Sequence, residues 1–335
     1  MSSVDGKTAL GLDEFGLIET YFRPLAAGEG GALSLLDDAA LLHVPEGLDL
    51  VVATDMVVAG VHFLPDCAPD RIAAKALAVN LSDLAAMGAE ARWYSLGLSL
   101  PGDVSADWLQ GFAKGLNAAQ TIHGVSLIGG DTTKTADGLT ISITVHGTVP
   151  RGRAVRRAGA RPGDALCASG TIGDAYLGLL ARTGSFDADA DWVVDAYEKP
   201  EPRLSLGRAL REVATAMTDV SDGLIADARH VAQASKVDVI LDIKRIPLSA
   251  TARNWINAQP DPEKAMISLM TGGDDYELIF SVPRSNHARL AELSKFAGPS
   301  ITAIGRIAAG SGSVLVCGGD GSPINIPRNL GYGHF

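Results

Sequence analysis

The stretch DRIAAKALAVNLSDLAAMGA, residues 70–89, combines a helical pattern with an acid in an otherwise small and apolar run. Its apolar spacing predicts one helix over about 69–87, and Gly88 marks the end of that helix. The many alanines imply that neighbouring elements pack closely against it. Asp83 lies inside this helix, where a carboxylate needs a partner or a bound ligand because burying it alone is costly.

The pattern of the first half of the chain, which includes this helix, predicts an α+β domain with several strands. The pattern predicts helices at 14–27 and 106–123, and strands at 39–44, 48–54, 93–100, 125–128 and 139–149.

The stretch RRAGARPGD, residues 156–164, is rich in Arg, Gly and Pro and indicates a boundary. Beyond it the elements are shorter and alternate. We expect strands at 165–169, 237–241 and 276–282, two closing strands, and helices at 175–181, 203–214, 224–234 and 285–296. The sequence therefore predicts an αβ domain at 1–150 and a second, α/β domain at 151–335.

Composition agrees with this organisation, because 335 residues are too many for one ordinary core and 47% hydrophobic content is ample for two. A net charge of −11 argues against a nucleic-acid backbone as the main partner. We see no apolar run of about 20 residues for a membrane span and no apolar signal-peptide core in the first 16 residues. The three cysteines share no metal-site spacing, so we expect a reduced, cytoplasmic protein.

A second acidic feature is LSLLDDAALL, residues 33–42, which places Asp37 and Asp38 side by side among leucines. Two unit charges about 5 Å apart repel by roughly 3 kcal/mol at an effective dielectric constant near 20. Either a turn lets both carboxylates reach water, or a bound cation holds them. The pair alone does not distinguish these interpretations, because Asp is a common turn residue.

Similar acids recur at the ends of strand-like runs. They are Asp55, Asp131, Asp219, Asp222, Asp274 and Asp275. Each of them, taken alone, is typical of a residue that caps a helix or forms a turn. As a set, they offer the oxygen ligands that hard cations such as Mg²⁺ prefer.

Two Gly-Gly-Asp stretches, at 129–131 and 272–274, are predicted to form turns. Such turns let the backbone approach a ligand closely and expose N–H groups to phosphate oxygens. The chain contains no G-x-x-x-x-G-K-[ST] or G-x-S-x-G motif and no G-x-G-x-x-G that opens a helix after a strand. The residues themselves thus indicate metal-assisted phosphate chemistry without a P-loop or a Rossmann fingerprint.

Taken in order, these motifs resemble the thiamine-monophosphate kinase family, from about residue 14 to the last residue. The wider superfamily includes aminoimidazole ribonucleotide synthetase and selenophosphate synthetase. The matching segments are DDAALL (37–42), ATDMVVAGVHF (53–63), KALAVNLSDLAAMGA (75–89), LIGGDTT (127–133), HGTVPRGRAVRRAGARPGD (146–164), TDVSDGL (218–224), GGDDYEL (272–278) and GYGHF (331–335).

The resemblance implies ATP-dependent phosphorylation of thiamine monophosphate to thiamine diphosphate, by direct in-line transfer of the γ-phosphoryl group with several Mg²⁺ ions. It implies a homodimer whose N-terminal strands join across the interface and a C-terminal domain that closes over the substrate. The acceptor phosphate has a low pKa, so no catalytic acid or base is assigned. Phosphoryl transfer needs positioning and charge neutralisation more than covalent chemistry.

The resemblance also implies roles for individual positions. The expected Mg²⁺ ligands are Asp38, Thr54, Asp55, Asp83, Asp131, Asp219 and Asp222; the expected ATP contacts are Gly130, Asp131, Arg157 and Ser221; the expected thiamine-phosphate contacts are His62, Asp274 and Tyr332. Two positions depart from the family pattern, which usually has Gly where Leu36 stands and often Glu where Asp274 stands.

Two other functions stay open at this stage. The chain can be another ATP-using synthetase of the superfamily, although a selenophosphate synthetase would carry a reactive Cys near its N-terminus and Cys67 lies well beyond it. It can also be a non-catalytic nucleotide-binding protein. ATP consumption with and without thiamine monophosphate separates the three.

Overall fold

The computed structural model describes residues 12–187, 191–326 and 331. The chain divides into two compact units: unit 1 comprises residues 1–84 and 90–151, and unit 2 comprises residues 85–89 and 152–335. Each unit contains a sheet with helices, so the expected two-domain α/β fold class is confirmed. Within the described residues, no helix has both the length and the apolar character needed to cross a membrane.

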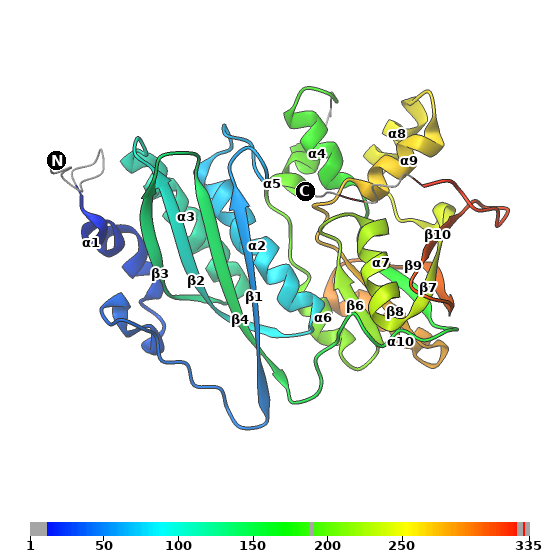
Figure 1. The fold of residues 1–335 in the computed structure, drawn as a ribbon, viewed down its shortest axis with the longest axis horizontal. Helices are drawn as coiled ribbons and strands as arrows, with labels where there is room; N and C mark the ends of the chain where they lie inside the picture. Colours follow the sequence, from blue (N-terminus) through cyan, green and yellow to red (C-terminus); the bar gives the residue numbers. More distant parts are fainter. Residues whose placement is uncertain (1–11, 188–190, 327–330, 332–335) are drawn as a thin grey trace. The chain divides into compact units, whose positions relative to one another are not determined.

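Unit 1 contains a four-stranded sheet with two long helices (Figure 1). Its strands are β1 (Leu48–Val58), β2 (Glu90–Pro101), β3 (Ser126–Thr135) and β4 (Thr140–Pro150). Its helical elements are α1 (Glu14–Leu17), the π-helical turn η1 (Ile18–Phe22), the 3₁₀ segments η2 (Arg23–Ala26) and η3 (Gly30–Leu35), and the helices α2 (Pro69–Ala86) and α3 (Ala106–His123).

The strand order of this sheet is β1-β4-β2-β3. Strand β4 pairs antiparallel with β1 and with β2, while β2 and β3 are parallel and joined through α3. The Ser105 hydroxyl starts α3 by accepting the Trp108 N–H at 3.1 Å, and Gly124 ends it in a left-handed conformation. This order makes β1 and β3 the two edges of the sheet.

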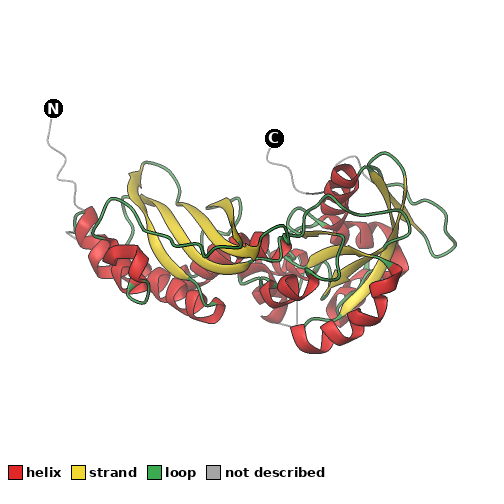
Figure 2. Cartoon of the chain, turned by 90° about the horizontal axis from the view of Figure 1, so that it is seen from below, coloured by secondary structure: helices red, strands yellow, loops and turns green. Residues whose placement is uncertain are grey.

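The two faces of the sheet differ in burial. On β4, Ile141, Ile143 and Val145 are buried, while Ser142 and Thr144 between them are half-exposed. Because alternate side chains of a strand point to opposite faces, one face is covered and the other is open. Figure 2 shows the helices of unit 1 on one side of the strands. The open face also carries exposed apolar side chains of β1, namely Leu50, Val52 and Met56.

The N-terminal segment departs from its prediction. The single helix expected over 14–27 is three short helical pieces, because Pro24 has no N–H to continue an α-helix and stands at the start of η2. The strand expected at 39–44 is wrong, since these residues form no strand. Ala40 and Leu42 instead pack around Ile128 of β3, so the apolar alternation reflects packing and not pairing.

Unit 2 contains a six-stranded sheet. Its strands are β5 (Ala165–Ser169), β6 (Ala216–Asp219), β7 (Val237–Asp242), β8 (Leu278–Val282), β9 (Ile301–Ala309) and β10 (Val314–Cys317). Its helices are α4 (Asp174–Arg182), α5 (Asp191–Glu198), α6 (Leu204–Leu210), α7 (Leu224–Ser235), α8 (Ala250–Ala258), α9 (Pro262–Thr271) and α10 (His287–Ala297), with short 3₁₀ turns η4 (Ile243–Arg245) and η5 (Arg284–Asn286).

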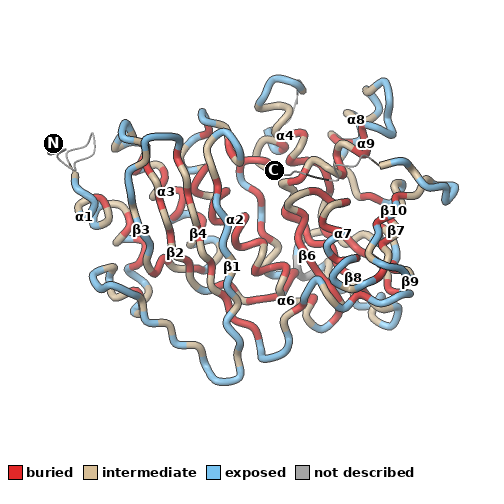
Figure 3. Tube along the Cα trace, viewed as in Figure 1, coloured by how far each residue is buried: buried red, intermediate tan, exposed pale blue. Residues whose placement is uncertain are grey.

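The strand order in unit 2 is β10-β7-β9-β5-β8-β6, with one parallel pair, β10 and β7. Helices cover both faces. On β8, Ile279 packs into a cluster with residues of α7 and α9, while Phe280 packs into a second cluster with residues of α6. Figure 3 shows β6 and β8 as buried along their length. Strands buried on both faces carry near-continuous apolar runs, as LIFSV (278–282) does.

Several elements of unit 2 differ from the sequence prediction. Strand β8 begins at Leu278 and not at Tyr276, because Asp274 and Tyr276 have positive φ angles of 62° and 49° that no strand accommodates. Elements α5, β6, α8 and α9 were not predicted. Two of them had readable start signals: Ser249 caps α8, and Asp261 followed by Pro262 begins α9.

The packing of α3 on the start of α2 gives a stability prediction. A Cβ atom added at Gly115 would lie 2.4 Å from the Asp70 carbonyl oxygen and 2.9 Å from the Ala73 Cβ atom. Gly115→Ala should therefore lower the free energy of unfolding by about 2 kcal/mol, despite the better helix propensity of Ala. Urea unfolding measures the change, with Gly28→Ala, which meets open space, as control. Equal stability of both variants would contradict this packing.

Candidate functional site

Unit 1 contains a cavity of about 710 Å³ between the N-terminal helical segment and strands β2, β3 and β4. Three residues predicted as metal or ATP contacts line it: Asp38, Gly130 and Asp131. Asp37 lines it as well. The cavity thus joins the acid pair of the N-terminal segment to the first Gly-Gly-Asp turn, two motifs about 90 residues apart in the sequence.

The carboxylates of this cavity suit a hard cation. Asp37, Asp38 and Asp131 are all exposed, so water eases their mutual repulsion in the absence of an ion. Carboxylate oxygens are the ligands that Mg²⁺ prefers, but the three carboxylates do not form one compact ligand group in this structure. The acid pair therefore reaches water, as the turn interpretation expects, and its role as a cation ligand stays a prediction.

Strain lies just before the acid pair. Leu33, Ser34 and Leu35 have φ angles of 50°, 57° and 55°, which non-glycine residues adopt at a cost of about 1 kcal/mol or more each. Leu36, where the family usually has Gly, has an ordinary φ of −108° and is 69% exposed. The departure at Leu36 therefore does not strain that residue itself.

Gly130 is required by the pairing of β3 with β2. A Cβ atom there would lie 1.9 Å from the Leu96 carbonyl oxygen. The close approach explains why the sequence has Gly at this position without any ligand. Its predicted ATP contact stays a prediction.

The metal ligands predicted on β1 lie elsewhere in unit 1. The Thr54 and Thr144 hydroxyl oxygens are 2.8 Å apart, and the Asp55 N–H donates to Asn80 Oδ1 of α2 at 2.8 Å. Asp83 follows Asn80 by three residues on the same helix and is half-buried. His62 Nδ1 accepts the Val58 N–H at 3.0 Å, which leaves the ring proton on Nε2.

The sheet order separates Asp55 from Asp131. Asp55 is opposite Ile143 of β4, and Ile143 is opposite Leu96 of β2. Leu96 is in turn opposite Gly130, the neighbour of Asp131 on β3. Three strand spacings make about 14 Å. Because two carboxylates on one Mg²⁺ have oxygens about 2 Å from the ion, Asp55 and Asp131 of one chain cannot share an ion.

Unit 2 gathers a second group of predicted residues where β6 meets α7. The loop between them contains Ser221 and Asp222, and its conformation is held by the buried Asp227 carboxylate in the first turn of α7. Asp227 Oδ2 accepts the N–H groups of Ser221, Asp222 and Gly223 at 3.0, 3.1 and 3.2 Å. This anchor was missed at the sequence level, although an acid in the first turn of a helix is a recognisable signal.

Carboxylates crowd this loop. Burial raises the pKa of Asp227 well above its usual range, and the neighbouring Asp219 and Asp222 carboxylates raise it further. Oxygens of Asp222 and Asp227 and a ring nitrogen of His230 lie within 4.8 Å of one another. Since Asp227 already accepts three N–H groups and Mg²⁺ prefers oxygen to imidazole, Asp222 is the ligand candidate in this group.

The second Gly-Gly-Asp turn packs directly on this loop. The Asp274 N–H donates to the Ser221 carbonyl at 2.8 Å, and the Tyr276 N–H donates to the Val220 carbonyl at 2.8 Å. The Tyr276 hydroxyl lies 3.2 Å from Asp274 Oδ1. Gly273 at φ 72° allows the close approach, since a Cβ there would lie 2.6 Å from the Ser221 carbonyl oxygen. The structure therefore brings the predicted ATP contact Ser221 and the predicted substrate contact Asp274 together.

Arg157 adds a positive charge to the group. Its Nε donates to the Thr218 hydroxyl at 3.2 Å, and its guanidinium lowers the pKa of His230, an effect second to burial. Arg157 thus lies beside the β6 end that carries Asp219. Tyr332, the remaining predicted substrate contact, lies outside the described residues.

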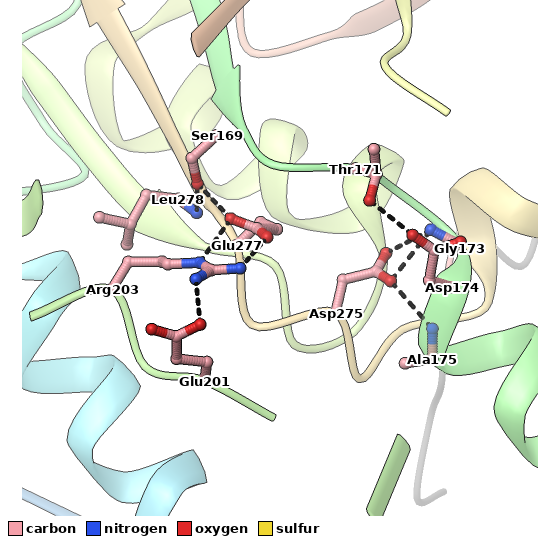
Figure 4. A network of polar contacts seen from close by, with 10 residues as sticks. All are labelled: Ser169, Thr171, Gly173, Asp174, Ala175, Glu201, Arg203, Asp275, Glu277 and Leu278. Carbon is pink, nitrogen blue, oxygen red and sulfur yellow. Dashed lines mark hydrogen bonds and ion pairs between the residues drawn. The ribbon is translucent and has the colours of Figure 1, made fainter. Parts of the chain in front are cut away.

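A polar network fixes the other side of the Gly-Gly-Asp turn (Figure 4). Glu277 is buried and accepts two hydrogen bonds from Arg203, at 2.9 and 2.6 Å, and one from the Ser169 hydroxyl. Asp275 accepts the N–H groups of Gly173 and Ala175 at the start of α4. The neighbouring Asp275 and Glu277 are held by these contacts, and the Asp274 N–H is bonded to the Ser221 carbonyl. The backbone at Asp274 is therefore fixed on both sides.

Both parts of the chain match known families. Residues 36–149 match the family described as AIR synthase related protein, N-terminal domain, and residues 161–318 match the corresponding C-terminal domain family. Thiamine-monophosphate kinase from Caulobacter vibrioides is 44% identical over 93% of this chain and 89% of its own length. The enzyme from Escherichia coli K12 is 41% identical over 96% of this chain and 98% of its own length.

Solved structures give the same relationship. A crystal structure of thiamine-monophosphate kinase from Stenotrophomonas maltophilia has a TM-score of 0.78 at 40% identity and covers 87% of this chain and 91% of its own. A structure of AaThiL in complex with AMPPCP and TMP has a TM-score of 0.76 at 29% identity, over 96% and 97%. The hydrogenase maturation protein HypE, at 22% identity and a TM-score of 0.75, shares the fold.

The Asp227 anchor gives a testable prediction. Asp227→Ala should lower the free energy of unfolding by about 2 kcal/mol, because the three loop N–H groups lose their acceptor. Asp227→Asn, which keeps one acceptor oxygen, should lose less. Thermal unfolding measures both.

Asp238 provides a matched control, since its carboxylate also accepts three N–H groups, those of Ser311, Gly312 and Ser313, but in an exposed loop. Asp238→Ala should cost less stability than Asp227→Ala and leave ATP binding unchanged. Equal losses for Asp227→Ala and Asp238→Ala would show that burial of the anchor is irrelevant.

Proposed function

The chain belongs to the thiamine-monophosphate kinase family within the AIR synthase related proteins, and on this premise we propose that it transfers the γ-phosphoryl group of ATP to thiamine monophosphate, giving thiamine diphosphate. It is a kinase with a phosphate group as acceptor. The observation that carries the proposal is the near full-length similarity to AaThiL, whose structure holds an ATP analogue together with TMP. The named curated relatives are thiamine-monophosphate kinases, which favours this activity over another superfamily synthetase or a non-catalytic nucleotide-binding protein.

The proposed ATP contacts are Gly130, Asp131, Arg157 and Ser221. The metal ligands proposed are Asp38, Thr54, Asp55, Asp83, Asp131, Asp219 and Asp222. The proposed contacts of the thiamine moiety are His62, Asp274 and Tyr332. The packing of Asp274 on Ser221 supports a substrate site beside the phosphate site in unit 2.

Several Mg²⁺ ions, when bound, would neutralise the triphosphate and the acceptor phosphate, which otherwise repel each other. The chain's own residues do the rest. The carboxylates hold the ions, Arg157 offsets charge on the nucleotide, and Asp274 offsets the cationic thiazolium of the substrate. The acceptor phosphate is already ionised, so in-line transfer needs no general base among these side chains.

The sheet order of unit 1 supports a homodimer. Asp55 and Asp131 lie at opposite edges, about 14 Å apart, so one chain cannot bring both to one ion. If two copies join their sheets, Asp131 of one subunit can meet Asp55 of its partner. The exposed apolar residues Leu50, Val52 and Met56 on β1, an edge strand of 11 residues, are what a joined sheet would cover.

This arrangement predicts complementation between two inactive variants. Asp55→Asn and Asp131→Asn should each abolish activity as homodimers. Co-expressed with different tags and purified through both, the heterodimer should recover about half of the wild-type activity, because one of its two sites receives both native acids. Steady-state ATP turnover with thiamine monophosphate measures the recovery.

The negative control pairs the Asp131→Asn chain with a chain carrying both substitutions, a heterodimer with no intact site. An Asp55→Asn/Asp131→Asn heterodimer as inactive as its parents would place both acids in a site within one chain.

The activity itself has a direct test. The purified protein should make thiamine diphosphate from thiamine monophosphate only with ATP and Mg²⁺ present, and chelation of Mg²⁺ should stop the reaction. Mass spectrometry identifies the product. Equal ATP consumption without the thiamine ester would contradict the proposed function.

We also place the protein in the cytoplasm. Cys67, Cys167 and Cys317 form no disulfide within the described part of the chain, and Cys67 and Cys167 are buried, a pattern that fits a reducing compartment.

A further inference from the structure

Two residues of the turn that precedes β8 adopt a left-handed backbone conformation although neither is glycine. Asp274 has a φ angle of 62° and Tyr276 has a φ angle of 49°. This region is unfavourable for any residue with a Cβ atom, and most of all for a bulky residue such as Tyr. Contacts around the turn must therefore hold it, and strained segments of this kind are common at binding sites.

One side of the turn is held by its backbone. The N–H groups of Asp274 and Tyr276 donate to carbonyls of the β6–α7 loop, those of Ser221 and Val220, each at 2.8 Å. These two bonds set where the turn passes the loop. The end of the turn, where β8 begins, needs a separate anchor.

That anchor is Glu277, whose buried side chain is paired with Arg203 (Figure 4). Arg203 Nε and Nη2 donate to the two carboxylate oxygens, at 2.9 and 2.6 Å. A two-point pair of this kind fixes the orientation of a carboxylate as well as its position. Because Glu277 directly follows Tyr276 in the chain, Arg203 determines where the strained turn ends.

The Glu277 carboxylate is tightly enclosed. A Cβ atom added at Gly170 would lie 1.9 Å from its Oε1 atom, and the Ser169 hydroxyl donates to its Oε2 atom. Without the guanidinium of Arg203, Glu277 would be a buried charge beside a neutral donor, which is strongly unfavourable. The segment would shift to bring the carboxylate to water, and the turn before it would lose its left-handed conformation.

The partners of Arg203 favour a role in holding the turn over direct contact with a ligand. All three of its guanidinium nitrogens already donate to carboxylates: Nε and Nη2 to Glu277, and Nη1 to Glu201 at 2.7 Å. The Arg203 side chain is 19% exposed, so little of it reaches solvent.

We propose that Arg203 is a positioning residue for thiamine monophosphate: through Glu277, it holds the 272–277 turn in the conformation that presents Asp274 to the thiamine moiety. The inference rests on the proposed function for the role of Asp274. It adds a residue that lies outside the proposed metal, ATP and substrate sets and acts through another side chain.

The test measures thiamine-monophosphate binding by calorimetry in the presence of Mg²⁺. Arg203→Lys keeps the charge but not the two-point geometry, so affinity should fall about 5- to 10-fold, as for one lost hydrogen bond. Arg203→Met, which also removes the charge, should lose more. ATP affinity should stay unchanged in Arg203→Lys, because Asp227 holds the Ser221 loop independently of the turn. Thermal unfolding checks that both variants fold, and Arg203→Lys alone suffices if Arg203→Met does not.

A double-mutant cycle separates positioning from direct contact. In the Asp274→Ala background, Arg203→Lys should cause no further loss of thiamine-monophosphate affinity, because the contact that Arg203 positions is already absent. Losses that simply add would make Arg203 a direct contact of the substrate and overturn the proposal.

Amide hydrogen exchange gives a second measurement, which needs no ligand. The N–H groups of Asp274 and Tyr276 should exchange faster in Arg203→Lys than in the wild type, because local opening of the turn breaks their hydrogen bonds to the loop.

Arg182 provides a matched control in the same unit. Its Nε donates at 2.6 Å to Glu198, whose side chain is 6% exposed, the same fraction as that of Glu277. This pair joins α4 to α5 and not to the turn before β8. Arg182→Lys should therefore leave thiamine-monophosphate affinity and the exchange of the Asp274 N–H unchanged, even where it lowers the melting temperature.

Two further outcomes would overturn the proposal. Unchanged thiamine-monophosphate affinity in both Arg203 variants would show that Asp274 does not depend on Arg203. An equal loss of affinity in Arg182→Lys would reduce the effect to general destabilisation. A wild type that binds thiamine monophosphate but forms no thiamine diphosphate with ATP and Mg²⁺ would overturn the proposed function and leave this inference intact.

Discussion

The pairing of β4 with both β1 and β2 constrains where the proposed ligands of unit 1 lie. Because β4 occupies the place between them, β1 and β3 become the edges of the unit 1 sheet, and the acids they carry are separated. Each edge carries residues proposed as oxygen ligands: Asp131 with the Gly-Gly-Asp turn on one side, and Thr54 and Asp55 on the other. Under the proposed ligand assignment, one metal site that uses both acids needs the β1 edge of one chain beside the β3 edge of another.

The same separation limits the repulsion among the acids of this protein. The net charge is −11, and the acids proposed as ligands are distributed over two units and several elements. Asp37, Asp38 and Asp131 are exposed to water, which weakens their repulsion. Only at the β6–α7 loop do acids crowd in a buried place, and there three backbone N–H groups offset the charge of Asp227.

The sequence predicted what local pattern controls. The long helices α2 and α3 and the strands of both sheets other than β6 follow from apolar periodicity and from caps such as Ser105 and Gly124. The run at 39–44 alternates like a strand but packs on β3, because strand pairing depends on partners that one segment does not specify. Likewise, the resemblance predicted Asp274 and Ser221 as site residues, yet only the structure shows the Asp274 N–H bonded to the Ser221 carbonyl.

Residues that the sequence could not reveal share one property, which is that their partners are distant in the chain or absent from it. Glu277 depends on Arg203, 74 residues away, and on Ser169, 108 residues away, so neither position alone indicates a network. Arg23 and His146 carry no motif, and their Nε and Nδ1 atoms, which have no hydrogen-bond partner among the described residues, become visible only once the fold has buried them beside the same cavity. Motifs therefore indicate the residues proposed for phosphate and metal binding, where carboxylates and glycines recur, whereas single side chains without a motif come to notice only when the fold brings them together.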